Sequence, residues 1–444
     1  MHGVVRAIAI AAVLAGVSSV TCGAGKAPAD LSGEWVAELT QTSVPNQDKL
    51  YQRFTLQQNG STLTGSARAG AITGSVQGGR IDFKIASTPV SSFQGTVKSG
   101  ELSGQLSGQM SGKASMPFGD VEWRAYRDPS SQAATPTTHD FVPKEFHRLF
   151  SGAIAPALKI HRGDIVKTWT VDAGGTAAND VRLSAGGNPQ TGPFYVEGAL
   201  PGDTLKITLI KVALNRDTAI SDGIISANAL TPGYHAAYKE EGTPIVVWSL
   251  DREHGVARLK EPTEKLKNYT IPLQPMLGCI AVAPPGGMAY RTGFQGVYGG
   301  NMDYNRIRQG TTVYLPVFQP GALLFVGDGH AAQGDGELTG NALETSLDLE
   351  FRVELIRGVS AGAVRAEDAE YRMAMGVAGS LNEALQEATT NMARWLAQDF
   401  KLNRAEVAYV LGTAMRYDIA EVVDPAYHVV ARLPKDALSR IAAQ

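Results

Sequence analysis

Short runs of alternating apolar and polar residues fill the first part of the chain. Such runs occupy residues 35–39, 51–56, 61–64, 71–76, 80–85, 93–97 and 121–125. Turn residues such as Asn59 and Gly60 separate them at intervals of roughly ten residues, the spacing of an antiparallel meander. We therefore predict an antiparallel β-meander or barrel at residues 30–128. We expect it to be an accessory binding or docking unit; the alternative is a spacer.

A second and larger unit follows a linker at residues 129–138, which is rich in Pro, Ser, Thr and Ala and lacks periodicity. Its strand patterns lie at residues 165–171, 204–212, 244–250, 278–283, 312–317, 322–326 and 347–356. No helical pattern separates them, which favours a jelly-roll-like β-sandwich over a parallel α/β sheet. Helical periodicity appears only at residues 380–400 and 403–412, each behind a capping residue. The predicted fold is mainly β, with a C-terminal helical addition inside a domain of residues 139–444.

The composition is that of an ordinary globular protein. Of the 444 residues, 43% are hydrophobic and 19% are charged, and the formal net charge is −3. The length leaves room for two or three domains. Nothing in this charge balance points to nucleic acid or to an anionic membrane surface, so we expect no nucleic-acid partner.

The first residues have the features of a secretory signal peptide. A basic start with Arg6 precedes an apolar run at residues 7–17, and small residues follow. The run is too short for a typical membrane-spanning helix. We predict a signal peptide at residues 1–24, a secreted or periplasmic location, and no transmembrane segment after cleavage. Lipid anchoring at Cys22 is the alternative, which residues 19–21 disfavour because they do not resemble the usual Leu-Ala-Gly sequence.

A glycine-rich acidic stretch at residues 327–337 stands out in the second unit. It holds four glycines, three carboxylates and one imidazole. Glycines disfavour both a helix and an ordinary strand, so we predict a bent loop. Because the preceding residues 314–326 are strongly apolar, we expect the loop to leave a buried core rather than a solvated surface turn, the alternative. Asp328 and His330 lie two residues apart and point to the same side in an extended chain, whereas Asp335 is expected to shape the bend.

Several longer motifs in this unit resemble one known family. The motifs are residues 188–199 with 201–205, 278–284, 299–303, 314–317 with 321–324, and 327–337 followed by Gly340 and Glu344. In this order they resemble the acetamidase/formamidase family over most of residues 139–433. The resemblance implies a jelly-roll-like β-sandwich with a helical addition. It also implies metal-assisted hydrolysis of small aliphatic amides to carboxylate and ammonia. Two features depart from the family pattern. The residues after Asp172 lack the longer polar stretch that family members carry there, and Ala281 stands where glycine is more usual.

Hydrolysis of an amide needs an activated nucleophile, stabilisation of the oxyanion and an acid for the leaving nitrogen. The one Gly-x-Ser-x-Gly match, at residues 358–362, is not followed directly by a helical pattern, so it does not indicate a nucleophile elbow, and Cys279 has apolar neighbours unlike those of a reactive thiol. Carboxylates and a histidine remain, which favours a metal-activated water. We predict Asp172, Asp328 and His330 as metal ligands. This mixed set of oxygen and nitrogen donors suits zinc best, with calcium as the alternative.

Other residues are candidates for proton transfer and substrate binding. Glu337 or Glu344 could carry the proton, and Asn301 could hold the carbonyl oxygen. The substrate-side candidates are Gly300, Asp303 and Glu197. Gly300 would offer its backbone N–H, and the alternative for the two carboxylates is the capping of turns.

Together these patterns predict a secreted amidase. Its substrate would be a small linear amide resembling acetamide or formamide, and the chain is expected to form a homo-oligomer. The alternative is a non-catalytic sandwich protein that binds a metal or a carbohydrate. The surplus of carboxylates beside His330 favours the enzyme.

Overall fold

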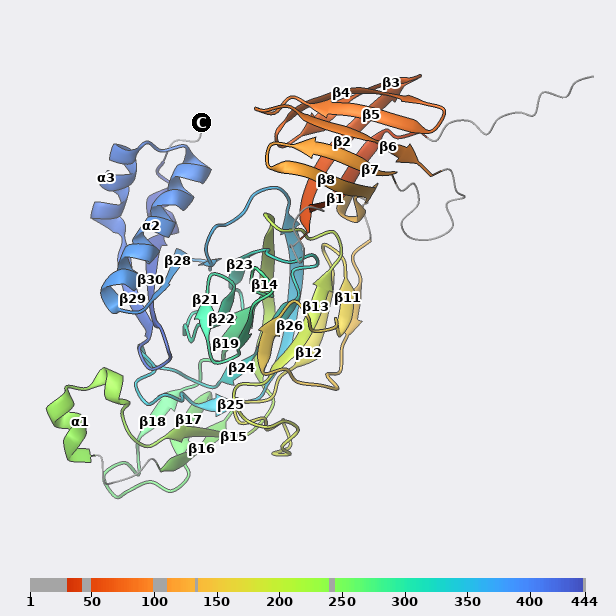
Figure 1. Ribbon diagram of the computed structural model, residues 1–444. Coiled ribbons are helices and arrows are strands. Elements are labelled where there is room, and N and C mark those ends of the chain that lie inside the picture. Colours follow the sequence, from red (N-terminus) through yellow and green to blue (C-terminus); the bar gives the residue numbers. More distant parts are fainter. Residues whose placement is uncertain (1–29, 42–48, 99–109, 132–134, 239–243, 442–444) are drawn as a thin grey trace, which may run out of the picture.

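The computed structural model describes residues 30–41, 49–98, 110–131, 135–238 and 244–441. A barrel, two large packed sheets and a small group of helices make up this part of the chain, as Figure 1 shows. The predicted signal peptide and Cys22 lie outside the described residues. Among the described residues, no helix has both the length and the apolar character needed to cross a membrane.

Eight antiparallel strands form a closed barrel at the N-terminal end, drawn in orange in Figure 1. The strands are β1 (Gly33–Gln41), β2 (Leu50–Asn59), β3 (Thr62–Ala67), β4 (Gly70–Gln77), β5 (Arg80–Ile85), β6 (Ser91–Val97), β7 (Met110–Met116) and β8 (Gly119–Arg127). Each strand pairs with the next, and β8 returns to β1. Aromatic rings fill the interior, where Phe83 stacks on Phe93 with centroids 4.7 Å apart and Trp123 contacts both edge-on. The barrel is therefore closed around a packed core.

Two large sheets pack face to face next to the barrel. The first contains β18 (Thr270–Pro272), β17 (Val256–Leu259), β16 (Ile245–Asp251), β15 (Thr218–Asp222), β25 (Glu344–Thr345), β24 (Leu324–His330), β19 (Met276–Ala281), β22 (Gly299–Asn301) and β21 (Gln295–Gly296), joined by β11 (Leu158–Ile160) and β13 (Gln190–Val196). The second contains β29 (Arg416–Glu421), β30 (Tyr427–Pro434), β28 (Tyr371–Ala378), β27 (Arg365–Glu367), β23 (Thr312–Pro316), β14 (Thr204–Leu214), β26 (Leu347–Ile356), β12 (Ile165–Trp169) and β9 (Thr138–Asp140). Phe194 of the first meets Phe351 of the second at 5.4 Å between ring centroids, within the main core. A pair of short strands, β10 (Leu149–Ser151) and β20 (Ala289–Arg291), lies beside them.

The C-terminal helices cover strands of the second sheet. Ser380 caps α2 (Leu381–Phe400) by accepting a hydrogen bond from the Glu383 backbone N–H, and Asn403 caps α3 (Arg404–Ala414) with a full capping box. The apolar stripe of α2 packs on β28 and β30. Gly376 allows this, because a Cβ there would lie 2.0 Å from the Ala384 carbonyl oxygen. The short helices α1 (Pro232–Tyr238) and α4 (Lys435–Leu438) lack a predicted counterpart. The mainly β fold class with a helical addition is confirmed.

Two arginines join the barrel to the sheets. Arg53 of β2 lies 2.6 Å from carboxylate oxygens of both Asp128 and Asp203, one on each side of the boundary. Arg357 pairs in the same way with Glu34 of β1. Both aspartates are buried, so these ion pairs fix the barrel on the larger unit.

The prediction of a bent loop is wrong for residues 327–330, which continue the buried strand β24. A Cβ at Gly327 would lie 2.6 Å from the Gln190 side chain, and one at Gly329 would lie 2.5 Å from Leu347. Glycine is needed in this strand because neighbouring groups approach closely, a reason that the sequence does not display. The chain turns away from the sheet only after His330.

Candidate metal centre and cavity

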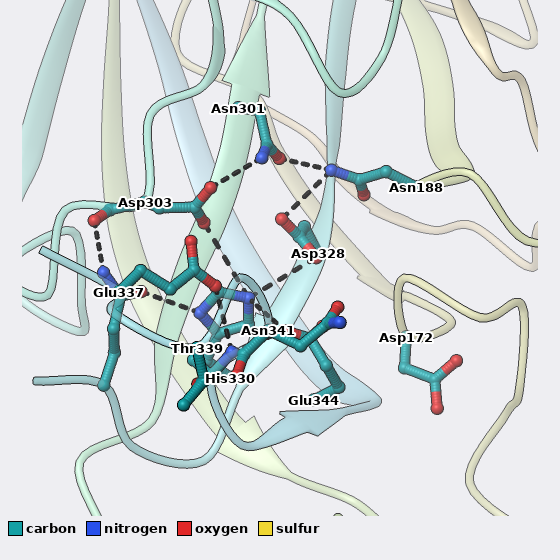
Figure 2. A network of polar contacts seen from close by, with 12 residues as sticks. Asp172, Asn188, Asn301, Asp303, Asp328, His330, Glu337, Thr339, Asn341 and Glu344 are labelled. Carbon is teal, nitrogen blue, oxygen red and sulfur yellow. Dashed lines mark hydrogen bonds and ion pairs between the residues drawn. The ribbon is translucent and has the colours of Figure 1, made fainter. Parts of the chain in front are cut away.

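The centre of the site is a buried group of five side chains, which we call the His330 cluster. Its members are Asp303, Asp328, His330, Glu337 and Glu344 (Figure 2). His330 and Asp328 share a face of β24, and Glu344 sits opposite His330 on the paired strand β25. The Nε2 atom of His330 lies 3.1 Å from Glu344 Oε1 and 3.5 Å from Asp328 Oδ1. It lies 3.8 Å from Asp303 Oδ1.

Backbone geometry is unusual around this cluster. Asp303, Asp328 and Glu337 adopt left-handed φ values of 39°, 61° and 45°. Such conformations are costly for residues other than glycine and concentrate at functional sites. Gly278 of the neighbouring strand β19 makes the room, because a Cβ there would lie 2.4 Å from Asp303 Oδ1 and 2.7 Å from Asp328 Oδ2. The sheet is therefore built to bring these carboxylates together.

Three buried carboxylate oxygens of the cluster have no hydrogen-bond partner within the described part of the chain. They are Asp303 Oδ1, Asp328 Oδ1 and Glu344 Oε2. An unpaired buried acceptor is unfavourable, and a cation removes that cost. The ligand atoms of Asp303, Asp328 and His330 lie within 4.8 Å of one another, as do those of His330, Glu337 and Glu344. One imidazole nitrogen with carboxylate oxygens is a suitable donor set, so the cluster can hold a metal ion.

Gln333 orients the imidazole of His330. Its Oε1 lies 2.9 Å from His330 Nδ1, and its Nε2 donates to the backbone carbonyls of Asp303 and Ala420. Since the amide nitrogen faces two carbonyls, the amide oxygen must face the histidine, which makes Nδ1 the protonated nitrogen. Nε2 points at the carboxylates, so its lone pair becomes available to a metal once the Nε2 proton leaves.

We predict that Gln333→Leu weakens metal binding by about 10- to 100-fold, the usual effect of losing the partner that orients a ligand histidine. The leucine side chain is one atom shorter than glutamine and cannot accept the Nδ1 hydrogen. Equilibrium dialysis against a competing chelator measures the change. The matched control is Gln274→Leu at an exposed position. Equal metal affinity in both variants would contradict the role of Gln333.

The cluster brings several carboxyl groups close to a single imidazole, and their pKa values are shifted as a result. Burial and the neighbouring Glu337 carboxylate raise the pKa of Asp303 well above its usual range. Burial also raises the pKa of Glu344, to about 7. For His330, burial alone lowers the pKa, but Glu344 and Asp328 outweigh it and hold the pKa well above normal. A bound cation would relieve the same repulsion.

Two asparagines connect the cluster to its surroundings. Asn301 donates one Nδ2 hydrogen to Asp303 Oδ2 and the other to Asp424 Oδ2, both at 2.6 Å. Its Oδ1 accepts from Asn188, which also donates to Asp328 Oδ2 at 3.1 Å. Both donors of Asn301 are therefore occupied, and we correct the prediction that it holds a substrate carbonyl oxygen. Asn188 and Asp424 were missed, because each comes from a distant segment; only the Asn188 motif gave a signal.

The predicted ligand role of Asp172 is also corrected. Its Oδ2 lies 2.7 Å from Arg216 Nη2, and its Oδ1 accepts a hydrogen bond from the Thr176 backbone N–H. Both oxygens are therefore paired within the protein. Figure 2 shows Asp172 apart from the other labelled carboxylates. This buried ion pair leaves no free oxygen for a metal.

The residues predicted to bind the substrate lie in different parts of the structure. Glu197 lies 3.6 Å from Lys159 and does not line the cavity described below, so this arrangement gives no support to its predicted contact with substrate. Gly300 is buried inside β22 and is also absent from the cavity wall. Asp303 belongs to the His330 cluster and does not line the cavity. Asp335 is exposed and accepts a hydrogen bond from Asn305, in keeping with its predicted part in the bend.

A cavity of about 500 Å³ leads to the cluster. Asp328, Glu337 and Glu344 form part of its wall, while His330 and Asp303 lie behind them. Other polar groups on the wall are Asn188, Ser221, Asp222, Arg291, Asn301, Asn341 and Asp424. Apolar contact comes from Ile220, Ile245 and Phe294. The volume falls in the range of small-molecule sites.

Residues 281–440 match the family model described as the Acetamidase/Formamidase family. This part of the chain is therefore similar to that family. It contains His330, the whole of the following loop and Asp424, so the predicted resemblance is confirmed. A formamidase from Methylophilus methylotrophus is 24% identical over 212 residues, which cover 38% of this chain and 51% of the relative. The alignment thus spans about half the length of that curated relative.

Two solved structures of acetamidase/formamidase proteins share the fold of the larger unit. A predicted acetamidase/formamidase from Thermoanaerobacter tengcongensis is 28% identical with a TM-score of 0.59, covering 70% of this chain and 100% of the other. An acetamidase from Yersinia enterocolitica is 29% identical with a TM-score of 0.60, covering 69% of this chain and 94% of the other.

Proposed function

We propose that this protein is an exported amidase that hydrolyses the C–N bond of a small linear amide, with a divalent metal, zinc, in the His330 cluster. One observation carries the proposal. The unpaired buried oxygens Asp303 Oδ1 and Asp328 Oδ1 lie 3.8 Å and 3.5 Å from His330 Nε2, next to a cavity large enough for an organic amide. The names of the relatives support the reaction class.

The residues divide between holding an ion and handling protons. His330, Asp303 and Asp328 would hold the metal, with Glu337 and Glu344 adjacent on the other side. A divalent ion bound there supplies two things to hydrolysis: it lowers the pKa of a water and polarises a carbonyl oxygen. Glu337 and Glu344 line the cavity, so either can accept the proton that an attacking water releases. Gln333 keeps the imidazole fixed, and Asn188 holds Oδ2 of Asp328 so that Oδ1 remains free.

The experiment is an ammonia-release screen on purified protein with formamide, acetamide and longer linear amides, combined with elemental analysis. We expect turnover of at least one amide and bound zinc. Metal binding without any turnover would contradict the enzyme and support a non-catalytic metal-binding protein.

Export and assembly are part of the proposal. A signal peptide at residues 1–24 would place the enzyme outside the cytoplasm, and N-terminal sequencing of the mature protein tests it. The homo-oligomer stays a prediction, which light scattering can check.

A further inference from the structure

A tight turn in the C-terminal hairpin brings another carboxylate to the cavity. Residues 422–426 connect β29 to β30, and Asp424 of this turn lines the same cavity as Glu337 and Glu344. Asp424 is not a member of the His330 cluster. It therefore faces the substrate space without being one of the groups that would hold a metal.

The turn is held firmly in place. The backbone of Val422 donates to the Gly336 carbonyl at 3.1 Å, and Gly336 forms a parallel bridge with Glu421. Glu421 in turn accepts a hydrogen bond from the Asp424 backbone N–H at 3.0 Å. On the far side, Gln295 Nε2 donates to the Ala426 carbonyl at 2.9 Å. The turn is thus fixed both to the loop after His330 and to β21.

Within the described part of the chain, one oxygen of Asp424 is engaged and the other is not. Its Oδ2 accepts the 2.6 Å hydrogen bond from Asn301, whose second hydrogen goes to Asp303. No described residue donates to Oδ1. One side of the carboxyl group is therefore anchored, while the other is available to a molecule in the cavity.

We propose that Asp424 is a further catalytic residue that protonates the nitrogen of the departing amine. This inference rests on the proposed amidase function and adds a role for the C-terminal hairpin. The C–N bond breaks and its electron pair passes to nitrogen. The carboxyl O–H of Asp424 breaks as a new N–H bond forms, which releases ammonia and leaves Asp424 as a carboxylate. The proton lost by the attacking water passes through Glu337 or Glu344 to solvent, from which Asp424 recovers its own.

The surroundings suit this task. Burial raises the pKa of Asp424 to about 6, against the opposing effect of the Asn301 hydrogen bond. Among the charged groups around it, Asp328 raises the pKa and His330 lowers it, and the carboxyl groups of Glu421, Glu337 and Asp303 also interact with Asp424. A carboxyl group in this range still holds a proton in part of the molecules near neutral pH, as a general acid requires.

The test compares Asp424→Asn with the wild type on acetamide, or on the best amide of the screen. The asparagine keeps an acceptor for Asn301 but has no acidic proton. We expect kcat to fall by about 100-fold or more, the usual contribution of a general acid. We expect unchanged zinc content. In the wild type kcat falls as pH rises above about 6, because Asp424 loses its proton, and this alkaline decline disappears in the variant.

Asp335→Asn is the matched control, because it removes an exposed carboxylate from the neighbouring loop and should leave kcat within about 3-fold. Asp424→Glu retains an acidic proton, so it should keep the alkaline decline; loss of that decline would refute the role. A folded Asp424→Asn variant with near wild-type kcat, or with the same pH profile, would overturn the inference alone. Absence of ammonia release by the wild type on every amide would overturn the proposed function as well.

Discussion

His330→Ala is expected to abolish amide hydrolysis, with a loss of kcat/KM of at least about 1,000-fold. The substitution removes the one imidazole of the cluster and leaves its carboxylates without a nitrogen donor. Losing roughly 4 kcal/mol of transition-state stabilisation corresponds to a change of this size. Zinc content by elemental analysis should fall in parallel, because Nε2 is the only non-carboxylate ligand atom among the described candidate groups.

The matched control is His254→Ala. That histidine is exposed and pairs locally with Asp251. Its loss should leave both activity and zinc content unchanged. Full activity of a folded His330→Ala variant would refute the assignment of the site.

Gly278→Ala should have the second largest effect, although it adds only one methyl group. The new Cβ would lie 2.4 Å from Asp303 Oδ1 and 2.7 Å from Asp328 Oδ2, so both carboxylates must move. Displacing two ligands by a few tenths of an ångström or more should lower kcat/KM by about 100-fold. It should also weaken metal binding. Kinetics with acetamide and chelator competition measure the two effects.

Gly293→Ala is the control for this substitution. Gly293 also lines the cavity, but a Cβ there meets no atom within 4 Å. We expect near wild-type kinetics. If Gly278→Ala behaved in the same way, the close packing around Asp303 and Asp328 would have no functional importance.

Much of the fold could be predicted from local sequence patterns. Period-two alternation in residues 30–128 indicated the barrel strands, because alternation reports which face is buried. Capping residues Ser380 and Asn403 located the starts of the two long C-terminal helices. These signals depend only on near neighbours, and they hold without knowledge of the tertiary structure.

Packing between distant segments could not be predicted in the same way. Gly327 and Gly329 were interpreted as loop glycines, yet they lie in β24 because Gln190 and Leu347 press against them. Only the tertiary structure reveals those neighbours. The pairing of Asp328 with His330 was nevertheless predicted, because residues two apart share a side in a strand as well as in an extended loop.

In the site, too, contacts between distant segments could not be predicted from local sequence patterns. Asp172 was interpreted as a ligand because it ends a strand before glycines, whereas Arg216 neutralises it from a position 44 residues further along the chain. Asn188 and Asp424 reach the cluster only through the sheet register and the C-terminal hairpin. Ion pairs and hydrogen bonds between distant segments depend on the folded structure, so no local motif predicts them.

Metal removal and restoration tests the central claim most directly, namely that the His330 cluster holds the ion on which amide hydrolysis depends. Ammonia release from the preferred amide would be measured before chelation, after chelation and dialysis, and after addition of zinc. The account predicts that stripping removes most of the activity and that about one equivalent of zinc restores it, since Nε2 has a single lone pair. Undiminished ammonia release from protein that elemental analysis shows to be free of metal would contradict it.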